Sequence, residues 1–248
     1  MTSLKRYDSR PELSRPLLIE CLPGIGNVGK TAGDFIADSV KAKKFLSIYS
    51  GHFPPQVLLD EESVVEMACN ELWYAKGVGK RDIIFLKGNY QGSTQEGQFE
   101  LCEDIMEICL EYDVSEIITL GGYGTGTMID EPRVLGAVSD ASMKADYEKF
   151  GIQFLPNDPQ AGIIGASGVL VGLGKIYGIP SICIMGETSG YFIDHKSAMA
   201  IVNVLMKKLK VKINIKDLKV KSEQIDELTA KVKEFEEKSD DEDLRYFG

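Results

Sequence analysis

A glycine-rich segment near the N-terminus carries the residue types that could bind a phosphate. The segment Gly24-Ile25-Gly26-Asn27-Val28-Gly29-Lys30-Thr31 matches the phosphate-loop pattern G-x-x-x-x-G-K-[ST] and also contains G-x-G-x-x-G. It follows an apolar run and precedes a predicted helix, so backbone amides at the helix N-terminus are in place to cradle a phosphate. The residues that would form such a site are Gly24, Gly26, Asn27, Gly29 and Lys30.

Neither nucleotide interpretation of this segment finds a convincing partner residue. A phosphate loop needs a carboxylate after a second apolar strand to hold magnesium, and only Glu187 offers one. A dinucleotide site needs an acid after the next strand, where Ser50, Gly51 and His52 stand instead. We therefore favour a tight strand-to-helix turn in which glycines let backbone pack on backbone, with a capping or turn role for Glu187.

Other glycine-rich turns follow later apolar runs and predict a cleft. The carboxyl ends of parallel strands meet at one edge of a sheet, where small ligands bind. We expect Gly121, Gly122 and Glu187 to meet the first glycine loop there. No Ser/His/Asp set, nucleophile elbow or pair of carboxylates stands out along the cleft. The sequence therefore assigns no catalytic residue and no cofactor.

Composition and charge exclude several classes of partner. A formal net charge of -10 repels a phosphate backbone or an anionic membrane, so we expect neither nucleic acid nor membrane as a partner. Five cysteines without a Cys-x-x-Cys pair are interpreted as reduced core residues, and two histidines are too few for a transition-metal site. The N-terminus has no apolar leader and no apolar run is long enough to span a membrane. A cytoplasmic protein is expected.

The elements that must position these loops are strands and helices in alternation. Short apolar runs without polar alternation predict strands covered on both faces, as in a largely parallel or mixed sheet. An apolar stripe at spacings of three and four predicts one flanking helix, and a glycine-rich apolar stretch predicts a tightly packed buried helix. The expected class is α/β, with three α/β/α layers. The predicted strands are 17–21, 45–49, 82–86, 116–120, 134–138 and 181–185; the predicted helices are 98–112, 163–177 and 195–209, the last capped by Asp194.

Three parts of the chain differ in character. We expect residues 1–212 to form the α/β domain and residues 213–238 to form a C-terminal amphipathic helical segment. Within that segment apolar residues recur at 225, 228, 232 and 235, which suits a surface helix on its own domain better than a free coiled coil. Residues 239–248 predict an acidic linker and an aromatic tail; the tail residues that could bind a partner are Leu244, Tyr246, Phe247 and Gly248.

Several motifs together resemble the archaeal branch of the proteasome assembly chaperone family, the homologues of the second eukaryotic proteasome assembly chaperone. Their order and spacing match from about residue 17 to residue 210. In the family the position of Thr31 is often apolar, which suggests that the phosphate-loop match is accidental. The motifs are Leu22-Pro23-Gly24-Ile25-Gly26-Asn27-Val28-Gly29-Lys30, Phe53-Pro54-Pro55-Gln56-Val57, Leu120-Gly121-Gly122-Tyr123, Glu131-Pro132-Arg133-Val134, Gly165-Ala166-Ser167-Gly168 and Gly186-Glu187-Thr188-Ser189-Gly190-Tyr191.

This resemblance implies a fold similar to nucleoside phosphorylases and a homo-oligomeric chaperone, in some members a ring, that binds proteasome α-subunits. It carries over no catalytic residue. Some relatives end in a hydrophobic residue, a tyrosine and any last residue, whereas Phe247 stands here at the tyrosine position. The tail therefore either docks on the proteasome or folds back on its own oligomer. The alternative function is a nucleoside- or nucleotide-binding enzyme or sensor that uses the glycine-lined cleft.

Overall fold

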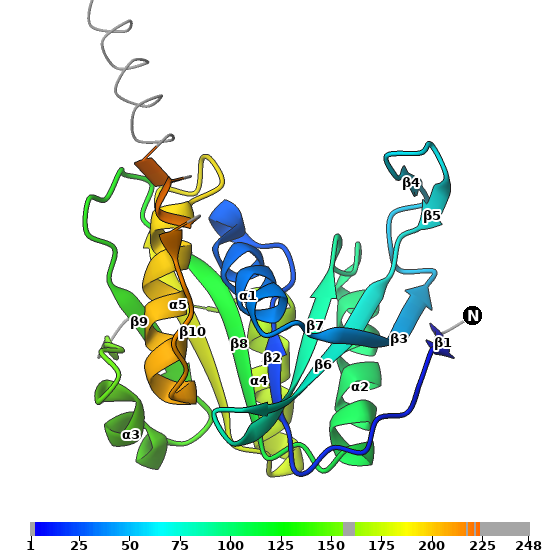
Figure 1. Cartoon of the computed structure of the whole chain (residues 1–248), viewed down its shortest axis with the longest axis horizontal. Coiled ribbons are helices and arrows are strands. Elements are labelled where there is room, and N and C mark those ends of the chain that lie inside the picture. Colours follow the sequence, from blue (N-terminus) through cyan, green and yellow to red (C-terminus); the bar gives the residue numbers. More distant parts are fainter. Residues whose placement is uncertain (1–2, 156–161, 217, 221, 224–248) are drawn as a thin grey trace, which may run out of the picture. The chain divides into compact units, whose positions relative to one another are not determined.

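A computed structural model of the chain describes residues 3–155, 162–216, 218–220 and 222–223. The chain divides into two compact units, Met1–Ile213 and Asn214–Gly248, and the sheet and its helices belong to the first. Figure 1 shows this first unit as a twisted sheet with helices on both faces. The predicted three-layer α/β/α class is confirmed.

The central sheet has eight strands and is mixed, within the predicted class. Its four middle strands, β7, β2, β8 and β10, run parallel, and each flanking strand pairs antiparallel with its neighbour. The middle strands are mostly buried, because helices cover both faces of this part of the sheet. In spatial order the strands are β1 (Ser3–Tyr7), β3 (Lys43–Ser50), β6 (Asn70–Val78), β7 (Arg81–Gly88), β2 (Leu17–Glu20), β8 (Glu116–Gly124), β10 (Ser181–Thr188) and β9 (Val134–Val138).

Four helices form the two outer layers of the first unit. On one face α1 (Val28–Ser39) packs beside α5 (His195–Leu209), and on the other α2 (Gln95–Glu111) packs beside α4 (Ala166–Tyr177). The short α3 (Lys144–Glu148) follows β9, after the 3-10 turn η2 (Ala141–Met143). Another 3-10 turn, η1 (Ile25–Asn27), links β2 to α1.

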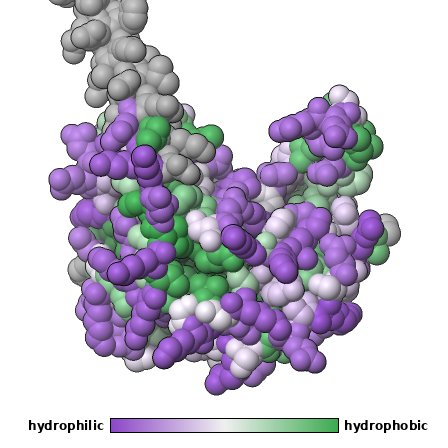
Figure 2. All heavy atoms as spheres, viewed as in Figure 1, coloured by the Kyte–Doolittle hydropathy of each residue, from purple (hydrophilic) through white to green (hydrophobic). Residues whose placement is uncertain are grey.

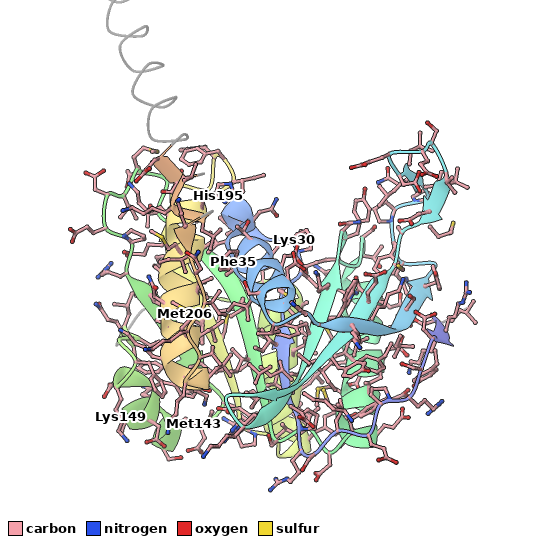
Figure 3. All side chains as sticks on the ribbon, viewed as in Figure 1. Lys30, Phe35, Met143, Lys149, His195 and Met206 are labelled. Carbon is pink, nitrogen blue, oxygen red and sulfur yellow. The ribbon has the colours of Figure 1, made fainter. Side chains whose placement is uncertain are left out.

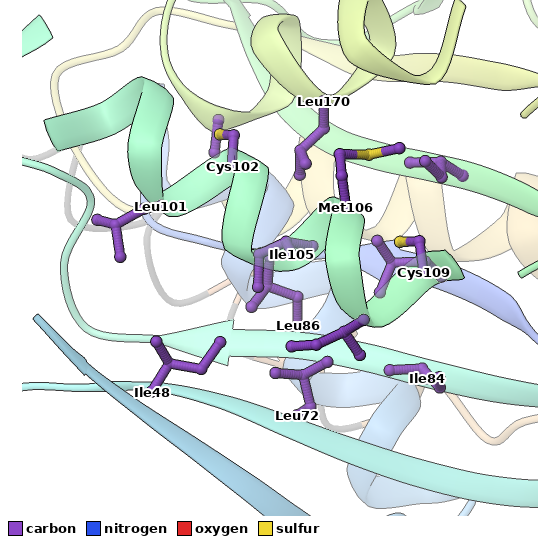
Figure 4. Packing of buried hydrophobic residues seen from close by; sticks show 14 of the residues in the cluster. Ile48, Leu72, Ile84, Leu86, Leu101, Cys102, Ile105, Met106, Cys109 and Leu170 are labelled. Atoms are coloured by element: carbon purple, nitrogen blue, oxygen red, sulfur yellow. The ribbon is translucent and has the colours of Figure 1, made fainter. Parts of the chain in front are cut away.

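The core under α2 shows why the apolar stripe predicted this helix. The Thr94 side chain caps the first turn by accepting a hydrogen bond from the Gly97 amide at 3.0 Å. Leu101 and Ile105 lie against apolar residues of β3, β6 and β7, as Figure 4 shows, and Ile108 is buried in the same cluster. Burial of each such side chain contributes about 1.5–3 kcal/mol to folding. The predicted stripe is confirmed.

The helix α4 is less buried than its glycine-rich sequence predicts. A Cβ at Gly174 would lie 1.9 Å from Ser181 Oγ, so this glycine allows the helix to approach β10 closely. The outer side of α4 is open to solvent instead, since Ile176 is 78% exposed. The stretch therefore forms a close-packed helix, but a surface one.

The helix α5 has the predicted bounds and the predicted cap. The Asp194 carboxylate accepts a hydrogen bond from the Ser197 amide at 2.9 Å. Near the other end, Lys208 turns inward and donates to both carboxylate oxygens of Glu116 at 2.9 Å and to the hydroxyl of Tyr147 at 2.9 Å. This buried cluster joins α5 and α3 to the amino end of β8.

The sequence did not predict four strands, and two predicted strands pair differently. The unpredicted strands are β1, β6 and the hairpin of β4 (Val57–Leu59) and β5 (Val65–Met67), all of which are partly exposed. The strands β1, β5 and β6 mix polar with apolar residues, whereas β4 is a run of only three apolar residues. The strands β3 and β9 run antiparallel to their neighbours, whereas a parallel arrangement was the main expectation.

Of the predicted C-terminal helical segment, residues 216, 218–220 and 222–223 are helical. The repeat at residues 225–235 and the tail at residues 239–248 lie outside the described residues. All five cysteines are free thiols; four are buried, and Cys69 is half-buried. Among the described residues, no helix is both long and apolar enough to cross a membrane.

Candidate functional site

The glycine turns lie together at the carboxyl edge of the sheet, but they pack on one another. A Cβ on Gly122 would lie 2.3 Å from the carbonyl oxygen of Ile25, and one on Gly190 would lie 3.2 Å from the Ile25 side chain. Gly26 has a φ of 59°, and its carbonyl accepts a hydrogen bond from the Asp194 amide at 2.9 Å. The η1 turn therefore packs directly against the carboxyl end of β8 and the loop after β10.

The next glycine of the motif serves the packing of α1 on the sheet. A Cβ on Gly29 would lie 2.2 Å from the carbonyl oxygen of Leu120 on β8, which is far closer than any real contact. Gly33, one turn later, has the same role, because its Cβ would lie 2.1 Å from the Cβ of Cys21. By contrast, Gly24 has open space around it, and a Cβ on Gly121 would make ordinary contacts.

The lysine of the motif faces the sheet edge beside α1. Lys30 Nζ donates to Asp34 Oδ2 at 2.9 Å and to the carbonyl oxygen of Gly88 at 3.1 Å (Figure 3). Asp34 also pairs with Lys87 at 3.2 Å. The preceding Asn27 adopts a left-handed conformation, with φ of 49°. Lys30 thus has protein partners that tie α1 to the end of β7.

Glu187 holds a loop against the sheet, the turn role favoured from the sequence. Its carboxylate accepts hydrogen bonds from the Arg133 amide at 3.0 Å, from Arg133 Nε at 2.9 Å and from the other arm of the guanidinium. The hydrogen bonds from Arg133 lower the pKa of Glu187 below its ordinary value. Because both oxygens of this charged carboxylate accept hydrogen bonds from Arg133, the pair fixes the segment before β9 beside the end of β10.

A buried carboxyl that the sequence analysis missed lies at the end of β2. Glu20 is fully buried, and its oxygens accept hydrogen bonds from the Leu22 amide at 2.9 Å and from Ser167 Oγ at 2.9 Å. Burial raises the pKa of Glu20 to about 7. An acidic residue directly after Leu17-Leu18-Ile19 was the available signal, because a carboxylate that continues a doubly covered strand must be buried.

Glu20 predicts a pH dependence of stability with a definite sign. Its pKa is about 7 in the folded protein and 4.5 when unperturbed, so the folded state binds the proton more tightly. Stability is therefore unaffected by Glu20 below about pH 4.5, falls between pH 4.5 and 7, and stays lower above pH 7, by about 3 kcal/mol at most. We expect Glu20→Gln to raise the free energy of unfolding by about 2 kcal/mol at pH 8 and to leave it unchanged near pH 4.5.

Urea unfolding at several pH values measures this effect, and Glu187→Gln is the matched control. Because the pKa of Glu187 is lowered, its removal should destabilise the protein at pH 8 and do so less as the pH falls through that lowered pKa. A Glu20→Gln profile parallel to that of the wild type would contradict the role assigned to Glu20.

The contacts of Lys30 predict that the chain does not hydrolyse ATP or GTP. We expect Lys30→Ala to cost about 1 kcal/mol of stability, through the lost bonds to Asp34 and Gly88, and to leave partner binding intact. Thermal-shift measurements with each nucleotide and magnesium should show no saturable stabilisation of the wild type. Magnesium-dependent turnover that Lys30→Ala abolishes would refute this prediction.

Among the described residues, no group of three or more His, Cys, Asp or Glu side chains could hold a metal ion. The described groups at the carboxyl edge are the packed glycine turns, the buried carboxyl of Glu20 and the ion pair of Glu187 with Arg133. Each of them contacts other protein groups and so stabilises the fold.

Comparisons with known proteins agree along nearly the whole chain. A protein of Methanocaldococcus jannaschii, described only as uncharacterized, is 36% identical over 245 residues, which cover 95% of this chain and 93% of that protein. The crystal structure of PbaB from Pyrococcus furiosus, described as an archaeal proteasome activator, is 35% identical with a TM-score of 0.89, and the match covers 94% of this chain and all of that one.

A more distant structure shares the fold. PbaA from Pyrococcus furiosus, described as an archaeal homologue of a proteasome-assembly chaperone, is 24% identical with a TM-score of 0.77, and the match covers 98% of this chain and 97% of that one. The PAC2 family matches residues 18–233. The predicted resemblance is thereby confirmed: this chain belongs to the PAC2 family.

Proposed function

We propose that this protein is a proteasome assembly chaperone or activator that acts as a homo-oligomer and binds proteasome α-subunits. The observation that carries this proposal is the likeness to PbaB, at 35% identity and a TM-score of 0.89 over all of that chain. Because a shared fold alone does not imply a shared function, the proposal relies on this sequence identity together with the fold.

The packing at the carboxyl edge supports a docking protein over the nucleotide-binding alternative. The η1 turn packs closely against Gly122 and Gly190, and Lys30 is bonded to protein groups. The tail residues Tyr246 and Phe247 supply two adjacent aromatic rings, which suit an apolar pocket on a partner protein. We include docking of this tail on α-subunits in the proposal.

Purified proteasome subunits test the proposal. The chain should elute as a species several times its own mass of 27.3 kDa and should co-elute with free α-subunits. A chaperone should speed the assembly of particles from free subunits, whereas an activator should raise peptide hydrolysis by assembled particles. A chain that stays monomeric at micromolar concentration and has no effect in either assay would contradict the proposal.

A further inference from the structure

The β4–β5 hairpin presents an apolar face to solvent. In its antiparallel register Val57 is opposite Met67, and Leu59 is opposite Val65, so these four side chains lie on one face. Their residues are 49–66% exposed. Side chains of this size and exposure present roughly 400 Å² of apolar surface, the size of patch that marks an interaction site.

The hairpin is built to reach outward from the body. The segments that lead into and out of it are anchored by Phe53 and Ala68, which are buried in the core under α2. Two strands of three residues are marginally stable by themselves in water. A partner that covers the apolar face would therefore stabilise the hairpin.

The charge of the hairpin restricts what that partner can be. Residues 57–67 contain Asp60, Glu61, Glu62 and Glu66 and no lysine or arginine. Asp60 is used within the turn, where its carboxylate accepts from the amides of Glu62 and Val64 at 2.9 and 2.8 Å. Two hairpins placed face to face would bring both sets of carboxylates together, which is unfavourable. The complementary surface is apolar with lysine or arginine around it.

The same chain has a surface of that kind at the end of α5. Residues 211–213 fold back there, since the Val211 amide donates to the carbonyl of Met206 at 3.1 Å and the Ile213 amide lies 3.3 Å from Met206 Sδ. The resulting α5 groove has a volume of about 640 Å³, and none of the described residues that line it is acidic. Its lining is Asn203, Met206, Lys207, Lys210, Val211, Lys212 and Ile213.

We infer that the β4–β5 hairpin of one copy docks in the α5 groove of a second copy. This inference rests on the proposed homo-oligomer and specifies the surfaces through which its subunits meet. Apolar side chains of the hairpin meet Met206, Val211 and Ile213, and its carboxylates meet the three lysines. The hairpin follows β3 near one edge of the sheet, whereas α5 packs on β10 and β9 at the other edge (Figure 1). Figure 2 shows apolar surface at both places.

Because the two surfaces differ and lie at opposite ends of the sheet, the contact is head-to-tail. Repetition of a head-to-tail contact closes into a ring when the rotation between copies divides a full turn. The hairpin face supplies about half of the roughly 800 Å² that each partner buries in a stable interface. In a ring every chain uses both surfaces, so each chain gains two such contacts.

Substitutions on the two surfaces test the contact by light scattering of the full chain. Leu59→Asp should lower the oligomer mass toward 27.3 kDa, while Ile176→Asp, at an exposed position on α4, should leave it unchanged. Glu62→Lys and Lys212→Glu should each weaken association about tenfold, and the two together should restore it, because the charges then match again. Unchanged mass in Leu59→Asp, or no restoration in the double variant, would overturn the inference.

Cross-linking identifies the two surfaces directly. In a Cys69→Ser background, where the remaining native thiols are buried, chains with Leu59→Cys are mixed with chains with Met206→Cys and treated with a short bismaleimide. A cross-linked dimer should form in the mixture and in neither sample alone. Cross-linking of Leu59→Cys to itself would overturn the inference, since it would indicate hairpin-to-hairpin pairing.

Two readouts separate this inference from the proposed function. If Leu59→Asp keeps the oligomer mass and the wild type binds α-subunits, the contact is wrong while the proposed function holds. If the wild-type chain remains at 27.3 kDa at all concentrations, the homo-oligomer itself fails and the inference fails with it.

Discussion

Deletion of Tyr246–Gly248 should abolish association with proteasome α-subunits and leave the folded body intact. The tail follows four carboxylates in Ser239–Asp243, a stretch with no apolar side chain to pack in a core. We expect its two aromatic rings to bind a pocket that offers apolar walls. One tail binds weakly, but several on one oligomer bind well through their effective concentration, so the loss should exceed a hundredfold, on the order expected for multivalent binding.

The matched controls are Phe247→Ala, which removes one ring, and Phe247→Tyr, which restores the tyrosine of the relatives' pattern. The first should weaken binding and the second should strengthen it. Pull-down of α-subunits and oligomer mass are measured on each protein. Unchanged binding by the truncated chain would refute docking, and a smaller oligomer would show that the tail seals an interface within its own assembly.

Gly29→Ala should destabilise the protein by about 3 kcal/mol or more, the upper range for overpacking a close contact. The new Cβ would lie 2.2 Å from the carbonyl oxygen of Leu120, and this atom belongs to the backbone of a central strand. The helix α1 would have to move away from β8 and lose contacts along its buried face. In thermal unfolding we expect a fall in Tm of roughly 10 °C.

Gly24→Ala is the matched control within the same motif. Gly24 has extended backbone, with φ of -155°, and nothing within 4 Å of an added Cβ, so the free energy of unfolding should change by less than about 0.5 kcal/mol. Both glycines belong to the phosphate-loop pattern, but only Gly29 is needed for packing. If Gly24→Ala destabilised the protein as much as Gly29→Ala, the packing explanation of the motif would be wrong.

The parts of the fold that sequence predicts well are those in which local pattern and burial agree. The helix α5 has a capping aspartate, an apolar stripe and lysines at its end, and it was predicted with its observed bounds. The six predicted strands are all present, because their short length, their β-branched residues and the glycines that follow them favour strands over buried helices. The apolar pattern did not predict the antiparallel directions of β3 and β9, since strand direction depends on the connections between strands, which this pattern does not encode.

The site was harder to predict, because its residues act through contacts between distant segments. The sequence predicted that the glycine turns meet at one edge of the sheet, but it could not show that they pack on one another through Ile25. Arg133 and Glu187 pair across 54 positions. The hairpin was missed because Val57–Leu59 and Val65–Met67 are separated by acidic residues and are too short for a periodic signal.

Sedimentation velocity of the full chain mixed with proteasome α-subunits tests whether the chain is an oligomer that binds these subunits. We expect one faster-sedimenting complex that contains several copies of the chain, and its amount should fall when synthetic peptide Ser239–Gly248 is added in excess. Separate boundaries for the chain and the α-subunits at all ratios, together with saturable thermal stabilisation of the chain by a nucleotide, would contradict it and favour the nucleotide-binding alternative.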